Sequence, residues 1–289
     1  MAIALADLLR ERGEDPLAVT ADALQVYRGL ELLTGAANAA EQELLEHRLV
    51  SFVGPEETFS AGQFASLARE EIDAALAAGR RPLVVGGTGL YLQAALTDLQ
   101  LRPPPDPDIR GLIEGRVAQS GAPALHAELA RLAPSVAAGI DPRDRTRVVR
   151  ALELLEMGEE PPPAGAESRL WTAQLRHPTL LCGLVMERAA LYERIDARVD
   201  EMVAAGAAAQ VRAAEAAGAS RTARAALGFE ELLRGDIETT KRRTRNYAKR
   251  QLTWMRRLAD VHRIDVTGLA PEAAARRIAH ILAARPGAA

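Results

Sequence analysis

Apolar residues recur with helical spacing at the start of the chain, and a short continuous apolar run that predicts a strand follows them. Residues 2–12 carry their apolar side chains on one helical stripe, which Gly13 ends. The apolar run at 17–19 predicts a strand whose carboxyl end lies at Asp22. In an open α/β sheet, ligands bind at the carboxyl ends of the strands. The pattern therefore places Asp22 at the edge of the sheet where a site is expected.

The alternation of helix and strand continues through the next fifty residues. Residues 38–47 read as a helix and residues 48–53 as a second short strand. Ser60 and Gln63 form a capping box that opens a helix reaching residue 78. The strongest strand, PLVV at 82–85, runs into GGTGLYL at 86–92. An apolar strand, a glycine turn and a new helix are typical of a βα unit in a parallel sheet.

Two proline-rich stretches, 102–108 and 159–168, bracket a segment with helical periodicity. Its apolar positions are Leu112, Ile113, Val117, Leu125, Leu129, Leu132, Val148, Val149, Leu152 and Leu155. Strands at 180–186 and 263–266 and helices at 189–218, 239–258 and 271–284 follow. The pattern predicts an α/β core with a parallel sheet, made of residues 1–101 and 170–289, and a helical insertion of residues 102–169.

Composition narrows the class of protein. The chain has 289 residues, 48% of them hydrophobic and 26% charged, with a net charge of −3. No apolar run approaches the ~20 residues that cross a bilayer, and the amino terminus does not read as a secretion signal. The single cysteine, Cys182, excludes internal disulfides and a cysteine-rich metal site. These features favour a cytoplasmic enzyme or binding protein.

Two features of the core invite a chemical interpretation. Glycines directly after a buried strand let the backbone approach a phosphate or a nucleobase, and Thr88 adds a hydroxyl; the same glycines also suit a plain βα turn. Asp22 suits a general base or a carboxylate near a metal, and it equally suits a helix cap. The pattern does not decide between a ligand site and a plain turn for the glycines, or between a chemical role and a helix cap for Asp22.

The helix at 239–258 concentrates positive charge. Between Lys241 and Arg257 it carries eight cations and no acid, with Tyr247 and Trp254 interleaved. Cations that contact phosphates and aromatics that stack on bases are typical of nucleic-acid binding. The alternative is a solvated helix face whose two aromatics enter the core. In a chain that is acidic overall, this concentration favours RNA or a polyphosphate ligand.

The last helix of the insertion carries Arg147 and Arg150 at i, i+3. They suit a phosphate backbone, and they equally suit ion pairs with acids such as Asp144 and Glu153. The five histidines show no metal-ligand spacing, and no Ser/His constellation occurs. The pattern therefore gives no sign of a metal cluster or of acyl-transfer chemistry.

Five segments, taken in order, resemble the tRNA dimethylallyltransferases (isopentenyl transferases). They are TADALQVYRGLELLTG at 20–35, ETFSAGQF at 57–64, PLVVGGTGLYLQAAL at 82–96, DRTRVVRALELLEMGEEP at 144–161 and YAKRQLTWMRR at 247–257. The resemblance covers nearly the whole chain. It implies a P-loop-NTPase-like parallel sheet core with a helical insertion domain that grips the anticodon stem-loop of tRNA.

The resemblance also implies a reaction, in which a dimethylallyl group moves from dimethylallyl diphosphate to N6 of an adenine beside the anticodon. Mg²⁺ would neutralise the leaving diphosphate, with no protein ligand assigned to it. Asp22 would accept the N6 proton, and Gln25 and Thr88 would hold the extruded base, Thr88 being counted with the catalytic residues. The protein is expected to act as a monomer. The tRNA-binding residues so implied are Asp22, Ala23, Leu24, Gln25, Arg110, Thr146, Arg147, Val148, Val149, Arg150, Gly228, Phe229, Lys249, Arg250, Gln251 and Arg256.

One element of the family is missing from these 289 residues. The phosphate loop G-x-x-x-x-G-K-S/T supplies N–H groups, a lysine and a metal-binding hydroxyl, and Met1 falls within what resembles the helix that follows it. We favour a misplaced start codon over a degenerate gene as the explanation, and we expect this chain alone to transfer little or no prenyl group. Two alternatives stay open: a tRNA-binding protein that lacks catalysis, and a small-molecule P-loop kinase.

Overall fold

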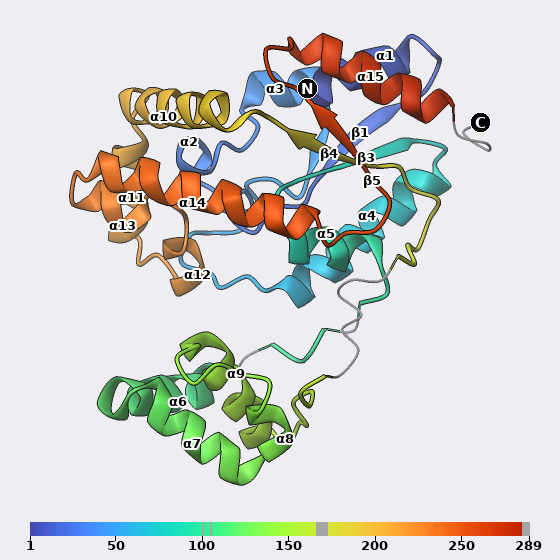
Figure 1. Cartoon of the computed structure of the whole chain (residues 1–289). Helices are drawn as coiled ribbons and strands as arrows, with labels where there is room; N and C mark the ends of the chain where they lie inside the picture. Colours follow the sequence, from blue (N-terminus) through green and yellow to red (C-terminus); the bar gives the residue numbers. More distant parts are fainter. Residues whose placement is uncertain (100, 105, 166–172, 285–289) are drawn as a thin grey trace. The chain divides into compact units, whose positions relative to one another are not determined.

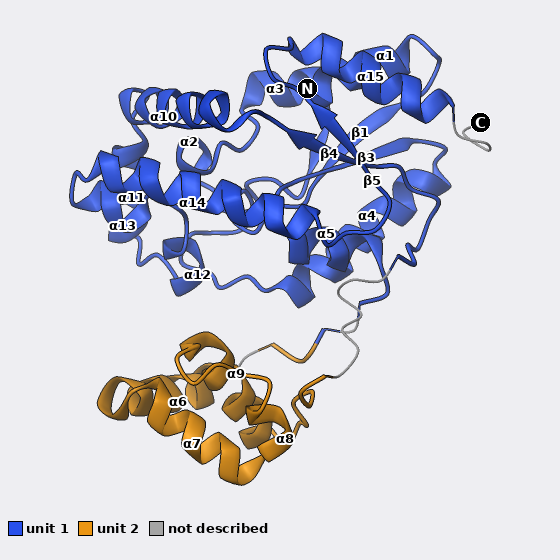
Figure 2. Cartoon of the chain, in the orientation of Figure 1, with its two compact units in different colours: residues 1–101, 170–289 blue, residues 102–169 orange. Residues whose placement is uncertain are grey.

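The structure is a computed structural model that describes residues 1–99, 101–104, 106–165 and 173–284. The chain divides into two compact units (Figure 2): unit 1 is residues 1–101 with 170–289, and unit 2 is residues 102–169. Both boundaries lie in or beside the proline-rich stretches. Each unit has its own hydrophobic core.

Unit 1 alternates short strands with helices (Figure 1). Its strands are β1 (Pro16–Thr20), β2 (His47–Arg48), β3 (Arg81–Val85), β4 (Leu181–Val185) and β5 (Val261–Asp265). Its helices are α1 (Ala2–Arg10), α2 (Glu31–Thr34), α3 (Ala39–Leu44), α4 (Ala61–Ala77), α5 (Gly89–Leu96), α10 (Arg188–Ala204), α11 (Ala207–Ala216), α12 (Arg221–Arg224), α13 (Phe229–Leu233), α14 (Ile237–Met255) and α15 (Pro271–Ala283).

All paired strands are parallel, as the βα pattern predicts. The described strands form one sheet of order β2-β1-β3 and a second sheet of β4 with β5. In the first sheet the register runs from Pro16↔Arg81 to Thr20↔Val85, so β1 and β3 end side by side. Residues that follow these two strands therefore meet at the same edge.

Strand β1 is buried on both faces, as is usual for a parallel strand covered by helices. Leu17 and Val19 belong to the large core cluster that includes Phe64 of α4. Ala18, which points the other way, packs with Ala6 of α1. The short apolar run of β1 is thus the centre of the first sheet and fixes the direction in which the chain reaches Asp22.

The predicted start and end of α4 are confirmed. Ser60 Oγ accepts a hydrogen bond from the backbone N–H of Gln63 at 3.3 Å, and Gln63 Oε1 accepts one from the backbone N–H of Ser60 at 3.0 Å. At the other end, Gly79 adopts a φ of 72°, which a residue without a side chain tolerates best. Local sequence therefore determines both ends of this helix.

The strand predicted over residues 48–53 is wrong in most of its length. Only His47–Arg48 joins the sheet, next to Ala18 and Val19. Leu49 and Ser51 have φ values of 59° and 47°, in the left-handed region that interrupts a strand. Val53 forms only an isolated parallel bridge with Tyr27, outside the strands of the sheet.

Unit 2 is a small helical unit. Its helices are α6 (Pro107–Ser120), α7 (Ala122–Leu132), α8 (Pro134–Ala137) and α9 (Arg145–Glu156). Most of the predicted apolar stripe forms its core, but Leu112 and Leu132 are 72% and 59% exposed. Among the described residues of both units, no helix is long and apolar enough to cross a membrane.

Candidate active site

Asp22 and Thr88 meet at the carboxyl ends of β1 and β3. Thr88 Oγ1 lies 3.4 Å from Asp22 Oδ2, to which it donates, and it accepts a hydrogen bond from the backbone N–H of Ala23 at 3.3 Å. Both side chains are half-buried. A carboxylate and a hydroxyl at this edge of a parallel sheet can accept and hold a proton from a bound substrate.

The interpretation of Asp22 as a helix cap is not what the structure shows. The next helix, α2, begins only at Glu31. Asp22 Oδ1 instead accepts a hydrogen bond at 2.9 Å from the backbone N–H of Leu24, two residues on, which closes a tight turn. This bond orients the carboxylate toward Thr88 rather than stabilising a helix.

Helix α14 lies directly on the glycine loop that contains Thr88. Tyr247, Gln251 and Trp254 follow i, i+4, i+7 spacing and share one helical face. The Tyr247 hydroxyl is 3.4 Å from Thr88 Oγ1, and Gln251 Nε2 donates to the Gly87 carbonyl at 3.1 Å. The two aromatics of this helix thus face the glycine loop, and both are half-buried rather than part of the hydrophobic core.

The glycines of the loop allow this close approach. A Cβ on Gly87 would overlap the Gln251 amide, and a Cβ on Gly89 would overlap the Trp254 indole. A Cβ on Gly86 would collide with the backbone carbonyl of Ala21. At each of these three glycines, other protein atoms occupy the space that a side chain would need. Only glycine therefore fits where α14 and the chain after β1 pack against the loop.

Tyr247 is a residue of the site for which the sequence left two alternatives open, stacking on a base or burial in the core. Burial raises the pKa of its phenol, the Asp22 carboxylate acts in the same direction, and the hydrogen bond with Thr88 opposes them. The guanidinium of Arg250 lies 5.4 Å from the centroid of its ring. In the sequence, the spacing of Tyr247, Gln251 and Trp254 indicates that the three residues share one face of a helix. It does not indicate which part of the protein that face contacts.

The residues that follow Asp22 lie close to it in the turn. Ala23 and Leu24 are half-buried, and their backbone N–H groups bond Thr88 and Asp22. Gln25 Nε2 donates to the carbonyls of Thr34 and Gly35 at 3.4 and 3.3 Å. The amide of Gln25 is therefore engaged with the end of α2 in this structure.

The cations of α14 fall into two groups. In the first half, Lys241, Arg243 and Arg245 pair with Asp200, Glu231 and Asp196 of unit 1. In the second half, Lys249, Arg250 and Arg256 are exposed. Lys249 contacts the ring of Tyr192, 5.9 Å from its centroid. Among the described residues, Lys249, Arg250 and Arg256, the last directly after α14, form no ion pair with an acid. Arg242 of the first half forms none either and donates to Thr239 Oγ1 at 3.2 Å.

In unit 2, two of the expected RNA-contacting arginines hold a buried acid. Glu153 is fully buried, and Arg110 bonds it through Nε and, at 2.7 Å, through Nη2. Arg150 Nη1 reaches the same carboxylate at 3.2 Å, and its Nη2 bonds the carbonyl of Pro103. Arg147 is different: its side chain is 69% exposed, and its one ion pair within the described residues is with Asp144, at 3.4 Å. Thr146 is exposed as well.

The remaining expected tRNA-binding residues lie in the interior. Val148 and Val149 belong to the core of unit 2. Phe229 is fully buried in unit 1, and Gly228 adopts a φ of 94° against Thr240. The buried side chains of Val148, Val149 and Phe229 hold the backbone of neighbouring residues in place. A contact of tRNA with that backbone stays a prediction.

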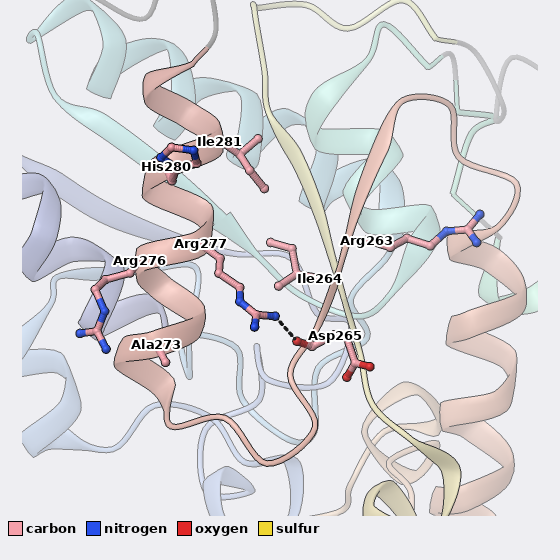
Figure 3. A pocket seen from close by; sticks show the side chains of 8 residues that line it. All are labelled: Arg263, Ile264, Asp265, Ala273, Arg276, Arg277, His280 and Ile281. Atoms are coloured by element: carbon pink, nitrogen blue, oxygen red, sulfur yellow. Dashed lines mark hydrogen bonds between the residues drawn. The ribbon is translucent and has the colours of Figure 1, made fainter.

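A hollow of about 560 Å³ lies elsewhere in unit 1, between β5 and α15 (Figure 3). Arg263, Arg276, Arg277 and His280 line it, and Arg277 donates to the backbone carbonyl of Asp265 at 3.0 Å. None of the residues that line it belongs to the Asp22 site.

The sequence of the chain matches that of a known family of transferases. The family model described as IPP transferase matches residues 25–258. The chain belongs to the IPP transferase family. Its tRNA dimethylallyltransferase relatives include that of Kineococcus radiotolerans, 39% identical over 98% of this chain and 92% of the relative. That of Anaeromyxobacter dehalogenans is 41% identical over 96% of this chain and 94% of the relative.

A solved IPP transferase has the same fold. The full-length tRNA isopentenylpyrophosphate transferase of Bacillus halodurans is 32% identical, with a TM-score of 0.68 over 98% of this chain and 91% of that chain. The expected fold class, a P-loop-NTPase-like α/β core with a parallel sheet, is confirmed. Membership in this family favours a transferase over the kinase alternative.

Proposed function

We propose that this IPP transferase moves a dimethylallyl group from dimethylallyl diphosphate to N6 of an adenine beside the anticodon of tRNA. The observation that carries the proposal is the Asp22–Thr88 pair at the carboxyl ends of two adjacent parallel strands. Relatives that cover nearly all of the chain are named for this reaction. The protein would act as a monomer in the cytoplasm.

The residues of the site suit the proton that the reaction releases. The adenine leaves its stack, N6 attacks C1 of the allyl group, and the C1–O bond breaks with its electron pair on the diphosphate. The N6 proton passes to Asp22. Each oxygen of Asp22 accepts one hydrogen bond, from Leu24 or from Thr88, and a carboxylate oxygen has room for a second. Asp22 thus keeps acceptor capacity for the proton while its orientation is fixed.

The tRNA would be bound through exposed positive charge on each unit. In unit 1 the contributors are Lys249 and Arg250 of α14 and Arg256 directly after it, and in unit 2 they are Arg147 with Thr146. Arg110 and Arg150 support the insertion through Glu153, which is a positioning role in the same proposal. Cations without acidic partners release counterions when they meet phosphates, so they supply most of the affinity.

Mg²⁺ would accompany the diphosphate and neutralise its charge as the C1–O bond breaks. The described residues contain no group of three His, Cys, Asp or Glu side chains that could hold a metal ion. Magnesium is commonly bound by phosphate oxygens, water and one or two carboxylates. We therefore assign the ion no protein ligand and no step of its own.

A transfer assay tests the proposal. The purified chain and a version extended upstream to include the phosphate loop are each mixed with an anticodon stem-loop, Mg²⁺ and labelled dimethylallyl diphosphate. Label in RNA and binding of RNA are measured separately, and variants are compared in the extended version. Asp22→Asn should lower transfer by about 10² or more while RNA binding stays within about twofold. Asp15→Asn is the matched control, because Asp15 precedes the same strand at its opposite end.

The two measurements separate the alternatives. RNA binding with no transfer even by the extended wild-type version supports the tRNA-binding protein that lacks catalysis. Transfer that survives Asp22→Asn removes Asp22 from the mechanism. Absence of both activities contradicts the proposed function altogether.

A further inference from the structure

Thr88 has three hydrogen-bonding neighbours, and only one of them comes from the helix that covers the site. The backbone N–H of Ala23 lies 3.3 Å from Thr88 Oγ1, Asp22 Oδ2 lies 3.4 Å from it, and the Tyr247 hydroxyl lies 3.4 Å from it on the opposite element, α14. The proposed mechanism uses Asp22 and Thr88 and gives Tyr247 no part.

The roles of these three neighbours follow from their chemistry. A threonine hydroxyl donates one hydrogen bond and accepts two. The N–H of Ala23 can only donate, and a carboxylate such as that of Asp22 can only accept. If Thr88 donates to Asp22, its second acceptor position is left for Tyr247, whose hydroxyl must then be the donor. With all three partners in place, Asp22 Oδ2 is the acceptor that remains for the Thr88 hydroxyl proton.

Tyr247 is held firmly enough to act in this way. Four residues on, Gln251 bonds the carbonyl of Gly87, and three residues further Trp254 covers Gly89. Burial and the neighbouring carboxylate raise the pKa of the Tyr247 phenol, so the phenol keeps its proton at neutral pH and remains a donor. The helix thus presents a fixed donor to Thr88.

We propose that Tyr247 is a positioning residue for the transfer reaction, whose hydroxyl donates to Thr88 and thereby keeps the Thr88 proton on Asp22 Oδ2. The inference rests on the proposed function. The N6 proton moves to Asp22, while Thr88 and Tyr247 keep their own protons, so the balance of the reaction is unchanged. Tyr247 acts only through Thr88 and touches neither the base nor the diphosphate.

A double-mutant cycle tests this arrangement. At saturating RNA and dimethylallyl diphosphate, Tyr247→Phe should lower kcat on the order of 10-fold, the usual effect of losing one hydrogen bond, with KM for RNA unchanged. Thr88→Val should lower kcat on the order of 10²-fold, because a bond to a charged group is lost. The double variant should be no slower than Thr88→Val alone, because residues that act through one another are not additive.

Tyr192→Phe is the matched control. It removes a hydroxyl from a tyrosine of α10 that also faces α14, while keeping the ring that Arg245 and Lys249 contact. Its kcat should equal that of wild type. Urea unfolding of each variant, measured in parallel, shows that the differences are not losses of folded protein.

Each outcome decides the question. Additive losses in the double variant, or an unchanged kcat for Tyr247→Phe, overturn the role of Tyr247 and leave the proposed function standing. A raised KM for RNA with unchanged kcat would make Tyr247 an RNA contact and also overturns it. All rates are measured on a version extended upstream to include the phosphate loop, because the 289 residues alone are expected to transfer little. An extended wild-type version that transfers no label overturns the proposed function and, with it, the role assigned to Tyr247.

Discussion

Gly89 has no room for a side chain, because the indole of Trp254 occupies the position that its Cβ would take. At the scale of single residues, this contact holds α14 on the loop that carries Thr88. Gly89→Ala should therefore displace the helix and lower the free energy of unfolding by about 1–3 kcal/mol, as overpacking of a tight contact does. Urea denaturation followed by tryptophan fluorescence measures the loss and the changed environment of Trp254.

Gly62→Ala is the control for this prediction. Gly62 lies in the first turn of α4, and the nearest atom to a Cβ built there is Ser60 Oγ at 3.8 Å, an ordinary contact. Alanine is favoured over glycine within a helix by about 1 kcal/mol, so this variant should be as stable as wild type or more so. Equal destabilisation by both substitutions would contradict the role assigned to Trp254.

At the same scale, sequence could predict some site residues and not others. Asp22 and Thr88 follow apolar strands, and the parallel pairing of those strands brings the two residues together without further information. Arg110 and Arg150 could not be separated from RNA-binding residues, because their partner Glu153 looks like any helical acid until its burial is known. The contact of Tyr247 with Thr88 could not be predicted for a similar reason, because helical spacing shows which residues share a face and not what that face contacts.

At the scale of elements, one buried carboxylate joins α6 to α9. Glu153 of α9 is fully buried and bonds Arg110 of α6 as well as Arg150 of its own helix. Glu153→Gln leaves two guanidinium groups without their counter-charge. Removal of one partner from a buried ion pair costs about 3–5 kcal/mol. Amide hydrogen exchange in α9 should accelerate by the corresponding factor.

The exposed acid on the same helix supplies the comparison. Glu156 lies three residues after Glu153 and is exposed. Glu156→Gln makes the same chemical change and should leave exchange in α9 within a few tenths of a kcal/mol of wild type. Similar effects of the two substitutions would show that Glu153 does not join the helices.

A second charged contact ties α4 to the segment that enters β4. Asp73 Oδ2 lies 2.6 Å from Arg176 Nη2, and Oδ1 lies 2.7 Å from His177 Nε2. The hydrogen bond from Arg176 is the largest cause that holds the pKa of Asp73 below its usual 3.8, with His177 acting in the same direction against burial. The contact therefore favours the folded state when Asp73 is ionised.

The sign of the pH dependence follows. A carboxyl whose pKa is lower in the folded state stabilises the protein above its unfolded pKa and loses that effect as pH falls through the folded pKa. Because Asp73 is partly exposed, the contribution at neutral pH is about 0.2–1 kcal/mol. Asp73→Asn should lower the unfolding temperature at pH 7, and its difference from wild type should vanish in strong acid. Glu70→Gln, at an exposed position of α4, should show no such dependence.

Elements whose ends are fixed by neighbours in sequence were predictable. The capping box of Ser60 with Gln63 and the glycine at position 79 determine α4 locally. The stretch 48–53 looked like a strand because it is apolar, yet left-handed backbone at Leu49 and Ser51 turns it away from the sheet. The residue types of Leu49 and Ser51 give no sign of this left-handed backbone, which the packing of the surrounding chain imposes.

At the scale of the whole molecule, the net charge of −3 hides a local excess of positive charge. In the first half of α14, cations form ion pairs with acids of neighbouring helices, as in the pairs Lys241–Asp200 and Arg245–Asp196. The second half keeps Lys249, Arg250 and Arg256 exposed. If RNA binds this surface, the affinity must depend on salt although the protein as a whole is acidic.

The dependence on salt separates specific cations from the general charge. For a single-stranded or stem-loop RNA, the logarithm of the binding constant should fall linearly with the logarithm of salt concentration. Arg256→Ala should weaken binding at low salt and reduce the slope by about 1, the value expected when one phosphate contact is lost. Arg212→Ala, which removes an exposed arginine of α11, should leave both affinity and slope unchanged. Equal slopes for wild type and Arg256→Ala would mean that the exposed end of α14 does not meet the RNA backbone.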